Sequence, residues 1–177
     1  MKKELLIHFS FLVSFFIFVS IVKGWLAFSF WPLWIGGLVG SLLPDVDHLI
    51  YIYLLRPHEL TSQRVNQMLG KRRFSDSLRL LAETRSERTK LIFHTATFQL
   101  IFLVLTFLVI TSSASIFGRG LVLAFYLHLL IDQAVDLVET GSLDNWFREL
   151  PVTLNSSQIK GYWLIMLFVV IIFGFLL

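Results

Sequence analysis

The stretch LVLAFYLHLLIDQAVDLV, which runs from Leu121 to Val138, decides the fold class of this chain. It is almost entirely apolar, and its length is close to the ~20 residues with which an α-helix crosses ~30 Å of hydrocarbon. It also carries His128, Asp132 and Asp136, which lie on one face of a helix because they are spaced four residues apart. The stretch therefore predicts a transmembrane helix with a polar stripe.

The composition of the whole chain is also typical of a membrane protein. Of its 177 residues, 56% are hydrophobic and only 15% are charged, which is too little polar surface for a soluble domain of this length. The 18 Phe and 5 Trp suit lipid-facing surfaces and interfacial belts. Because there is no Cys, disulfides and thiolate metal sites are excluded, and a bound metal would need His, carboxylate or carbonyl ligands.

Four other apolar segments have a similar length. They are Leu5 to Val22, Trp25 to Leu43, Leu91 to Ile110 and Tyr162 to Leu177. We therefore predict an all-α integral membrane protein with about five transmembrane helices and a helical cytoplasmic segment between the second and the third. The predicted helices of this single membrane domain, residues 1–177, cover residues 5–22, 25–43, 91–110, 121–138 and 162–177.

The basic residues predict how these helices are oriented. Nine of the 15 Lys and Arg lie in the one long polar segment, residues 56–90, and the positive-inside rule places it in the cytoplasm. Five crossings then put the N-terminus in the cytoplasm too and leave only Lys23 and Arg119 outside. We expect a multi-pass protein of the bacterial inner membrane, with two short helices, Glu59 to Leu69 and Asp76 to Arg85, in the basic segment.

Ionisable residues of four predicted helices gather at one depth in the membrane. A charge at the middle of a transmembrane helix costs roughly 2.5–3.5 kcal/mol, so such residues indicate function or strong pairing. At a rise of 1.5 Å per residue, His8 and His94 lie about 5 Å from the cytoplasmic ends of their helices. Asp132 lies in the inner third of the core, and the second helix ends in the block from Asp45 to His48. We expect these side chains to meet near the cytoplasmic face.

A cluster of imidazoles and carboxylates at this depth predicts a divalent-metal site. Carboxylates without a counter-charge would repel one another, whereas a cation offsets their charge, and mixed His/Asp sites suit zinc, manganese or iron. We expect zinc, with manganese and iron as alternatives. Asp45 is a further ligand or a catalytic general base, and ligands beyond the three or four of one zinc would orient the others or bind a second metal. The predicted metal ligands are His8, Asp47, His48, His94, His128 and Asp132.

Each of these residues also has an ordinary structural explanation. Asp45 to His48 could end a span at the interface after Pro44, where polar residues cost little. His128 and Asp132 could stabilise helix packing through hydrogen bonds, and His8 or His94 alone is more often a packing residue than a ligand. Their convergence at matched depth favours the metal site.

Three parts of the chain resemble the membrane-bound metal-dependent hydrolase family of small bacterial proteins, of the LexA-regulated type. Leu42-Leu43-Pro44-Asp45-Val46-Asp47-His48 matches its Leu-Leu-Pro-Asp-x-Asp-His block, and His128-Leu129-Leu130-Ile131-Asp132 matches its His-x-x-x-Asp motif. His8 corresponds to its early His. The family's His-Arg-Gly-x-Thr-His-Ser block is degenerate here. Thr89 and Leu91 replace its first His and its Gly, and the positions that stay similar are Lys90, His94 and Thr95.

The resemblance implies a membrane-bound metal-dependent hydrolase that works at the cytoplasmic interface. The depth of the cluster indicates a lipid or a lipid-linked phosphate or ester as substrate. Membrane lipids are the expected partners, and no nucleic acid is expected, because topology and headgroup contacts account for the basic segment. Two alternatives stay open: a non-enzymatic scaffold that docks a partner through residues 56–90, and a transporter whose His/Asp cluster binds a cation or a proton.

Overall fold

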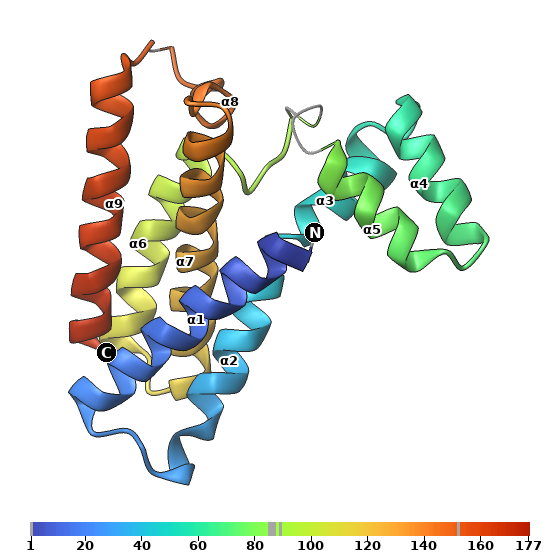
Figure 1. The fold of residues 1–177 in the computed structure, drawn as a ribbon. Helices are drawn as coiled ribbons and strands as arrows, with labels where there is room; N and C mark the ends of the chain where they lie inside the picture. Colours follow the sequence, from blue (N-terminus) through green and yellow to red (C-terminus); the bar gives the residue numbers. More distant parts are fainter. Residues whose placement is uncertain (1, 85–87, 89, 152) are drawn as a thin grey trace.

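The computed structural model describes residues 2–84, 88, 90–151 and 153–177, and all regular secondary structure in these ranges is helical, with no strand (Figure 1). Five helices are long: α1 (Lys2–Lys23), α2 (Trp31–Leu42), α6 (Ala96–Ser112), α7 (Ile116–Glu139) and α9 (Ser156–Leu176). The shorter elements are η1 (Phe28–Phe30), α3 (Val46–Ile50), the π-helical turn η2 (Tyr51–Leu55), α4 (Leu60–Gly70), α5 (Phe74–Glu83) and α8 (Asp144–Phe147). The all-α prediction is confirmed.

Within the described residues, four helical stretches are long and apolar enough to cross a membrane. They are Leu6–Lys23, Phe28–Leu55, Ile116–Glu139 and Ser156–Leu176. The fifth predicted span corresponds to α6, which is apolar but has only 17 residues. The structure thus agrees with a membrane protein, and a count of five spans stays a prediction.

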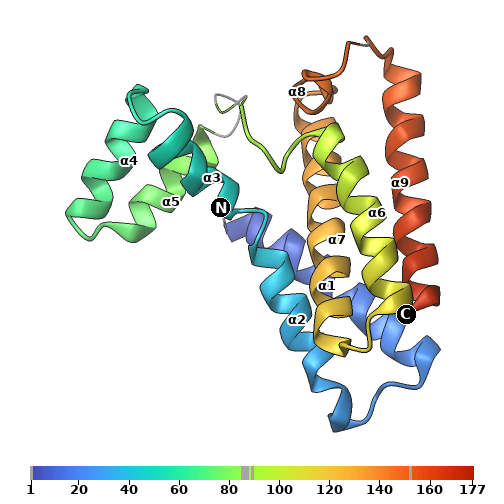
Figure 2. The ribbon, with the colours of Figure 1, turned by 180° about the vertical axis from the view of Figure 1, so that it is seen from behind.

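The long helix α7 is the centre of the bundle. It contacts α1, α2, α6 and α9, and 72% of its span is buried, against 22–28% of the other three spans. The polar stripe predicted from the sequence therefore lies inside the protein and not in lipid, because α7 has neighbours on every side. In Figures 1 and 2, α1 crosses this bundle obliquely.

Three predicted helix boundaries were wrong, and two of them lie next to the site. Residues 91–95 are not helical, and α6 begins at Ala96 because Thr95 caps it, with its hydroxyl accepting a hydrogen bond from the Phe98 amide. The second span does not begin at Trp25 but at the η1 turn, and it does not end at Leu43. It is interrupted around Pro44 and resumes as α3 and η2, because a proline weakens a helix locally.

Other boundaries moved by a few residues. The helix α9 begins at Ser156, before the predicted Tyr162, because Asn155 and Gln158 form a reciprocal capping box. The short helix α4 lies where predicted, whereas α5 begins at Phe74 and not at Asp76, and its predicted end at Arg85 lies outside the described residues.

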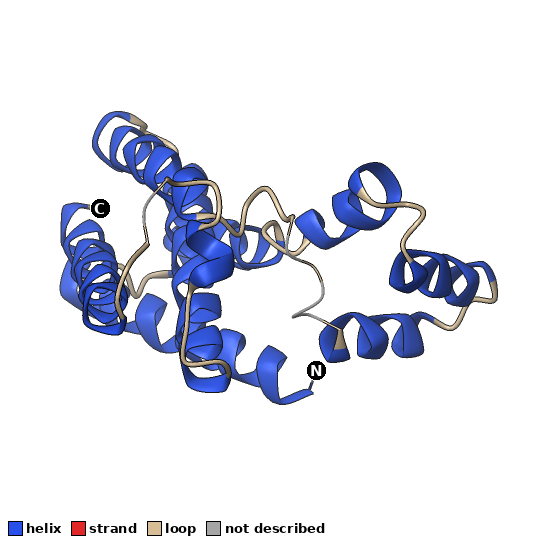
Figure 3. Ribbon diagram, turned by 90° about the horizontal axis from the view of Figure 1, so that it is seen from above, coloured by secondary structure: helices blue, strands red, loops and turns tan. Residues whose placement is uncertain are grey.

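The helices α4 and α5 form a separate arm, residues 60–83, which stands beside the bundle and not over it (Figure 3). Its small core consists of Ile52 from η2, Val65 from α4 and Leu81 from α5. Because η2 continues the second span, the arm is anchored directly at the end of that span.

Glycines allow α2 and α7 to approach each other closely. A Cβ atom on Gly36 or Gly40 of α2 would overlap the carbonyl oxygen of Phe117 or Leu121 in α7, and one on Gly120 would overlap that of Leu33 in α2. Backbone atoms cannot move aside as a flexible side chain can, so these positions need glycine.

We expect Gly40→Ala to destabilise the bundle by about 1–3 kcal/mol, because the added methyl group forces α2 away from α7. Gly161→Ala in α9 is the matched control, since no described atom lies within 4 Å of a Cβ atom there. Thermal unfolding in detergent should show a lower midpoint for Gly40→Ala only. Equal midpoints for the two variants would show that the close approach is not required.

Candidate metal centre

The predicted site residues come from four parts of the fold that meet where the arm joins the bundle (Figure 1). His8 lies on α1, and His128 and Asp132 lie one turn apart on α7. The break between α2 and α3 supplies Asp45, and α3 itself supplies Asp47 and His48. His94 lies in the non-helical connection before α6. The predicted convergence of these segments is therefore present.

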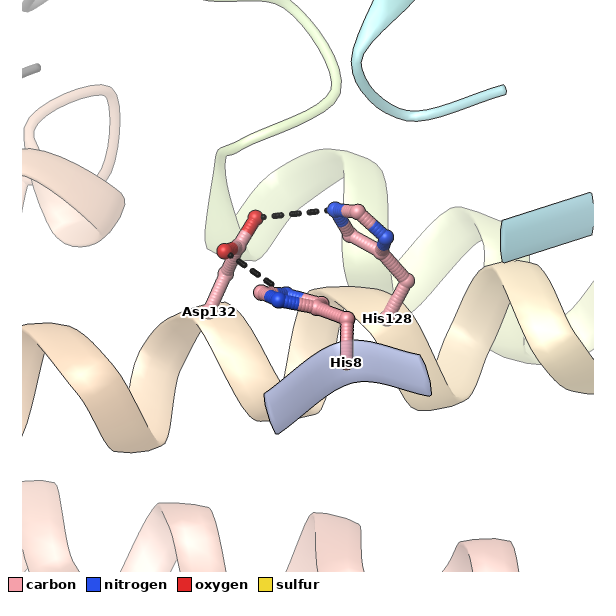
Figure 4. Close-up of side chains that lie close together, drawn as sticks. All are labelled: His8, His128 and Asp132. Atoms are coloured by element: carbon pink, nitrogen blue, oxygen red, sulfur yellow. Dashed lines mark hydrogen bonds and ion pairs between the residues drawn. The ribbon is translucent and has the colours of Figure 1, made fainter. Parts of the chain in front are cut away.

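The carboxylate of Asp132 is the centre of the cluster. His8 Nε2 lies 3.1 Å from its Oδ1 atom, and His94 Nε2 lies 2.9 Å from its Oδ2 atom. His128 Nε2 lies 3.2 Å from the same Oδ2 atom, and Figure 4 shows both His8 and His128 turned towards Asp132. Three imidazoles from three elements thus surround one carboxylate that is only 2% exposed.

Three of these residues form a group that could hold a metal ion. One ligand atom each from His8, His128 and Asp132 lies within 4.8 Å of the others. Both ring nitrogens of His128 are buried and make no hydrogen bond with any described residue, so its short distance to Asp132 lacks hydrogen-bond geometry. A buried polar atom without a partner costs about 1–3 kcal/mol, and a cation would satisfy it.

The donor set of this group fits a divalent cation. Two imidazoles and one carboxylate are ligands that zinc, manganese and iron share, in keeping with the predicted chemistry. The prediction of a divalent-metal site is thus supported by three of its six residues, while zinc in particular stays a prediction.

Asp47, which was also predicted to be a ligand, does not belong to this group. It is fully buried, and its carboxylate accepts hydrogen bonds from the backbone amides of Ile92 (3.0 Å), Phe93 (2.6 Å) and His94 (3.3 Å). Its Oδ2 atom also lies 3.1 Å from His94 Nδ1. Asp47 therefore fixes the connection before α6 and orients the imidazole that reaches Asp132.

His94 links the two buried carboxylates. Burial alone would favour its neutral form, but the hydrogen bonds and charges of Asp132 and Asp47 outweigh this effect and raise the pKa of His94 to about 9. At neutral pH its ring therefore carries a proton on each nitrogen and donates to Asp132 on one side and to Asp47 on the other. Its contact with Asp132 orients a candidate ligand.

His48 and Asp45 lie at the edge of the cluster. The Nδ1 atom of His48 accepts a hydrogen bond from Arg88 Nε (3.2 Å), and its ring stacks on that of His94 with centroids 5.2 Å apart. The side chain of Asp45 is 48% exposed, and its Oδ1 atom lies 3.7 Å from His128 Nε2. Asp45 is thus the carboxylate of the cluster that faces solvent.

The sequence did not single out Arg88 as part of this arrangement. It is 4% exposed and donates to the carbonyl oxygens of Leu81 and Thr84 as well as to His48, so it joins α5 to the cluster. No spacing could have revealed this, because Arg88 and His48 are 40 residues apart.

Trp146 on α8 supports the other side of the cluster. Its indole Nε1 donates to Asp136 Oδ2 (2.7 Å), and its ring packs against that of His94 with centroids 5.6 Å apart. Asp136, which continues the polar stripe of α7 beyond Asp132, is therefore a hydrogen-bond acceptor for α8.

Two cavities flank the cluster. A cavity of about 410 Å³ reaches His8, His128 and Asp132, and most of its other lining is apolar. A cavity of about 340 Å³ lies on the side of His94 and is lined mainly by polar residues of α7, α8 and the segment between them. Arg88 lines both cavities, and both volumes fall in the range of ~300–1,000 Å³ that is typical of ligand sites.

Comparisons with protein-family models, with curated proteins and with solved structures gave no match for this chain. The resemblance to the hydrolase family therefore stays a prediction from the motifs, and Thr89 of the degenerate motif lies outside the described residues.

We expect Asp47→Asn to destabilise the protein by about 1.5–3 kcal/mol. The side-chain NH2 group of Asn would replace one of the two carboxylate oxygens that accept hydrogen bonds from backbone N–H groups, so two donors would face each other. Hydrogen exchange at the amides of Ile92 and Phe93 should become faster, and the thermal midpoint should fall. The exposed Asp144→Asn substitution is the control. Unchanged exchange in Asp47→Asn would mean that the carboxylate does not order this connection.

Proposed function

We propose that this protein is a membrane-bound, metal-dependent hydrolase that acts at the membrane interface on an ester or phosphate group of a lipid-type substrate. The observation that carries the proposal is the group of His8, His128 and Asp132 at the wall of a ligand-sized cavity, with both ring nitrogens of His128 lacking a hydrogen-bond partner among the described residues. The motif resemblance around Asp45 to His48 and from His128 to Asp132 supports the same activity.

The proposed division of labour follows from the contacts. His8, His128 and Asp132 would hold the ion, and His94 keeps the Asp132 carboxylate in place. A bound divalent cation would polarise an ester or phosphoryl oxygen and lower the pKa of a water molecule. Asp45 is exposed to the cavity next to His128, so its Oδ1 atom is placed to accept a proton from water as a general base.

The orientation in the membrane forms part of the proposal. The basic arm, residues 60–83, and the cluster lie at the same end of the candidate spans, so under the positive-inside rule both would face the cytoplasm at a bacterial inner membrane. The reacting groups would then face the inner leaflet, where a lipid substrate is already present.

Metal analysis of the protein purified without chelators tests the site. Wild-type protein should contain a near-stoichiometric divalent metal, and Asp132→Asn or His128→Ala should remove most of it, because each deletes a candidate ligand. His58→Ala is the matched control, since His58 is an exposed histidine in the turn before α4. The wild-type protein, but neither ligand variant, should release fatty acid or phosphate from phospholipids in mixed micelles.

Two results would overturn parts of this proposal. Wild-type protein without metal would remove the basis of the site. Stoichiometric metal without hydrolysis of any phospholipid ester or phosphate bond would leave the metal site in place but remove the hydrolase.

Cysteine labelling tests the orientation, because the chain has no Cys of its own. In intact bacterial cells, a membrane-impermeant maleimide should label Leu26→Cys, which lies in the exposed connection between α1 and α2. It should not label Ser75→Cys on the arm until the cells are opened. The reverse labelling pattern would invert the proposed topology.

A further inference from the structure

We propose that the 410 Å³ cavity between the bundle and the arm is a binding site for an alkyl chain of a membrane phospholipid, and that α5 of the arm forms one wall of it. The inference rests on the proposed function and extends it, because it says which cavity of the protein binds the alkyl chain of the lipid substrate.

Large apolar side chains line the cavity from two sides, and most of them are exposed. From the bundle, Phe9 (58% exposed), Leu38 (44%) and Leu42 (54%) contribute to the lining. From the arm, Leu78 (54%) and the nearly buried Leu81 face the same space. An alkyl chain would cover these surfaces, and burial of apolar surface is favourable roughly in proportion to its area.

The position of the cavity indicates a membrane lipid as the occupant. Phe9 belongs to the candidate span Leu6–Lys23, and Leu38, Leu42 and Leu49 belong to the candidate span Phe28–Leu55. The cavity is therefore continuous with surfaces that these spans would present to hydrocarbon, and a chain could enter it from the bilayer without crossing water.

The charge of the arm complements an anionic headgroup. The arm, residues 60–83, contains five basic and only two acidic side chains, and basic segments beside a membrane attract anionic lipids. An anionic phospholipid is thus the occupant that both the apolar lining and the basic arm favour.

The polar end of the cavity indicates how the lipid would lie. His128, whose buried nitrogens have no hydrogen-bond partner among the described residues, borders the cavity together with His8, Asp132 and the exposed Asp45. A chain that occupies the apolar lining would bring its ester or phosphate linkage to these groups. Substrate binding and the candidate metal centre would then share one cavity.

A photoreactive phosphatidylglycerol with a diazirine in one alkyl chain tests the site. Titrated into the detergent-solubilised protein, it should give saturable labelling of the peptides that contain Leu38 to Leu49 and Leu78, and excess unlabelled phosphatidylglycerol should suppress it. Leu78→Trp, which fills the cavity from the arm, should weaken this labelling by roughly tenfold, equivalent to about 1.4 kcal/mol of binding.

Two further variants control the experiment. Leu60→Trp, on an exposed leucine of α4 that does not line the cavity, should leave the labelling unchanged. Leu38→Trp narrows the same cavity from the bundle side and should act like Leu78→Trp, so it decides the question if Leu78→Trp does not fold. Labelling that does not saturate would overturn the proposed alkyl-chain site. Equal labelling of both cavity variants and of the wild-type protein would overturn it too.

Metal content measured on the same samples separates this inference from the proposed function. Leu78→Trp should keep its metal, because Leu78 lies on α5 and is not one of the candidate ligands His8, His128 and Asp132. Wild-type protein that contains metal but gives no saturable labelling would reject the alkyl-chain site alone. Absence of metal with saturable labelling would reject the hydrolase and leave a lipid-binding cavity.

Discussion

The carboxylate of Asp132 on the central helix α7 is the constraint on which the arrangement depends. A buried carboxylate is costly unless hydrogen bonds and opposite charges compensate it. Here the compensation comes from His8 on α1 and His94 before α6. The charge that would otherwise oppose burial of α7 thus draws separate segments of the chain to one point.

A second buried carboxylate extends this network outwards. Asp47 holds the backbone of residues 92–94 and the imidazole of His94, while Arg88 connects His48 to the arm. The candidate metal centre is therefore supported by two layers of hydrogen bonds, and outer contacts of this kind orient and tune metal ligands. The glycines between α2 and α7 complete the arrangement by letting the second span approach the central helix.

The sequence was sufficient to predict the helical class and the meeting of His8, His128 and Asp132. A four-residue spacing fixes the last two on one face of a helix, and alternation of the spans fixes the end at which His8 lies. It could not separate the role of Asp47 from that of Asp132, because the partners of Asp47 are backbone amides of a non-helical connection. Apolar length alone had placed this connection inside a helix, and only the tertiary structure reveals its shape.

The candidate ligands differ in what holds them. His128 and Asp132 belong to one continuous helix, so their separation is set by the ~5.4 Å pitch and does not change when the helix tilts. His8 comes from α1, a largely exposed helix that crosses the bundle obliquely (Figure 1). Exposed transmembrane helices adjust their tilt to bilayer thickness. The thickness of a surrounding bilayer would thus act on His8 more than on His128 and Asp132, and it would change the spacing of the three candidate ligands.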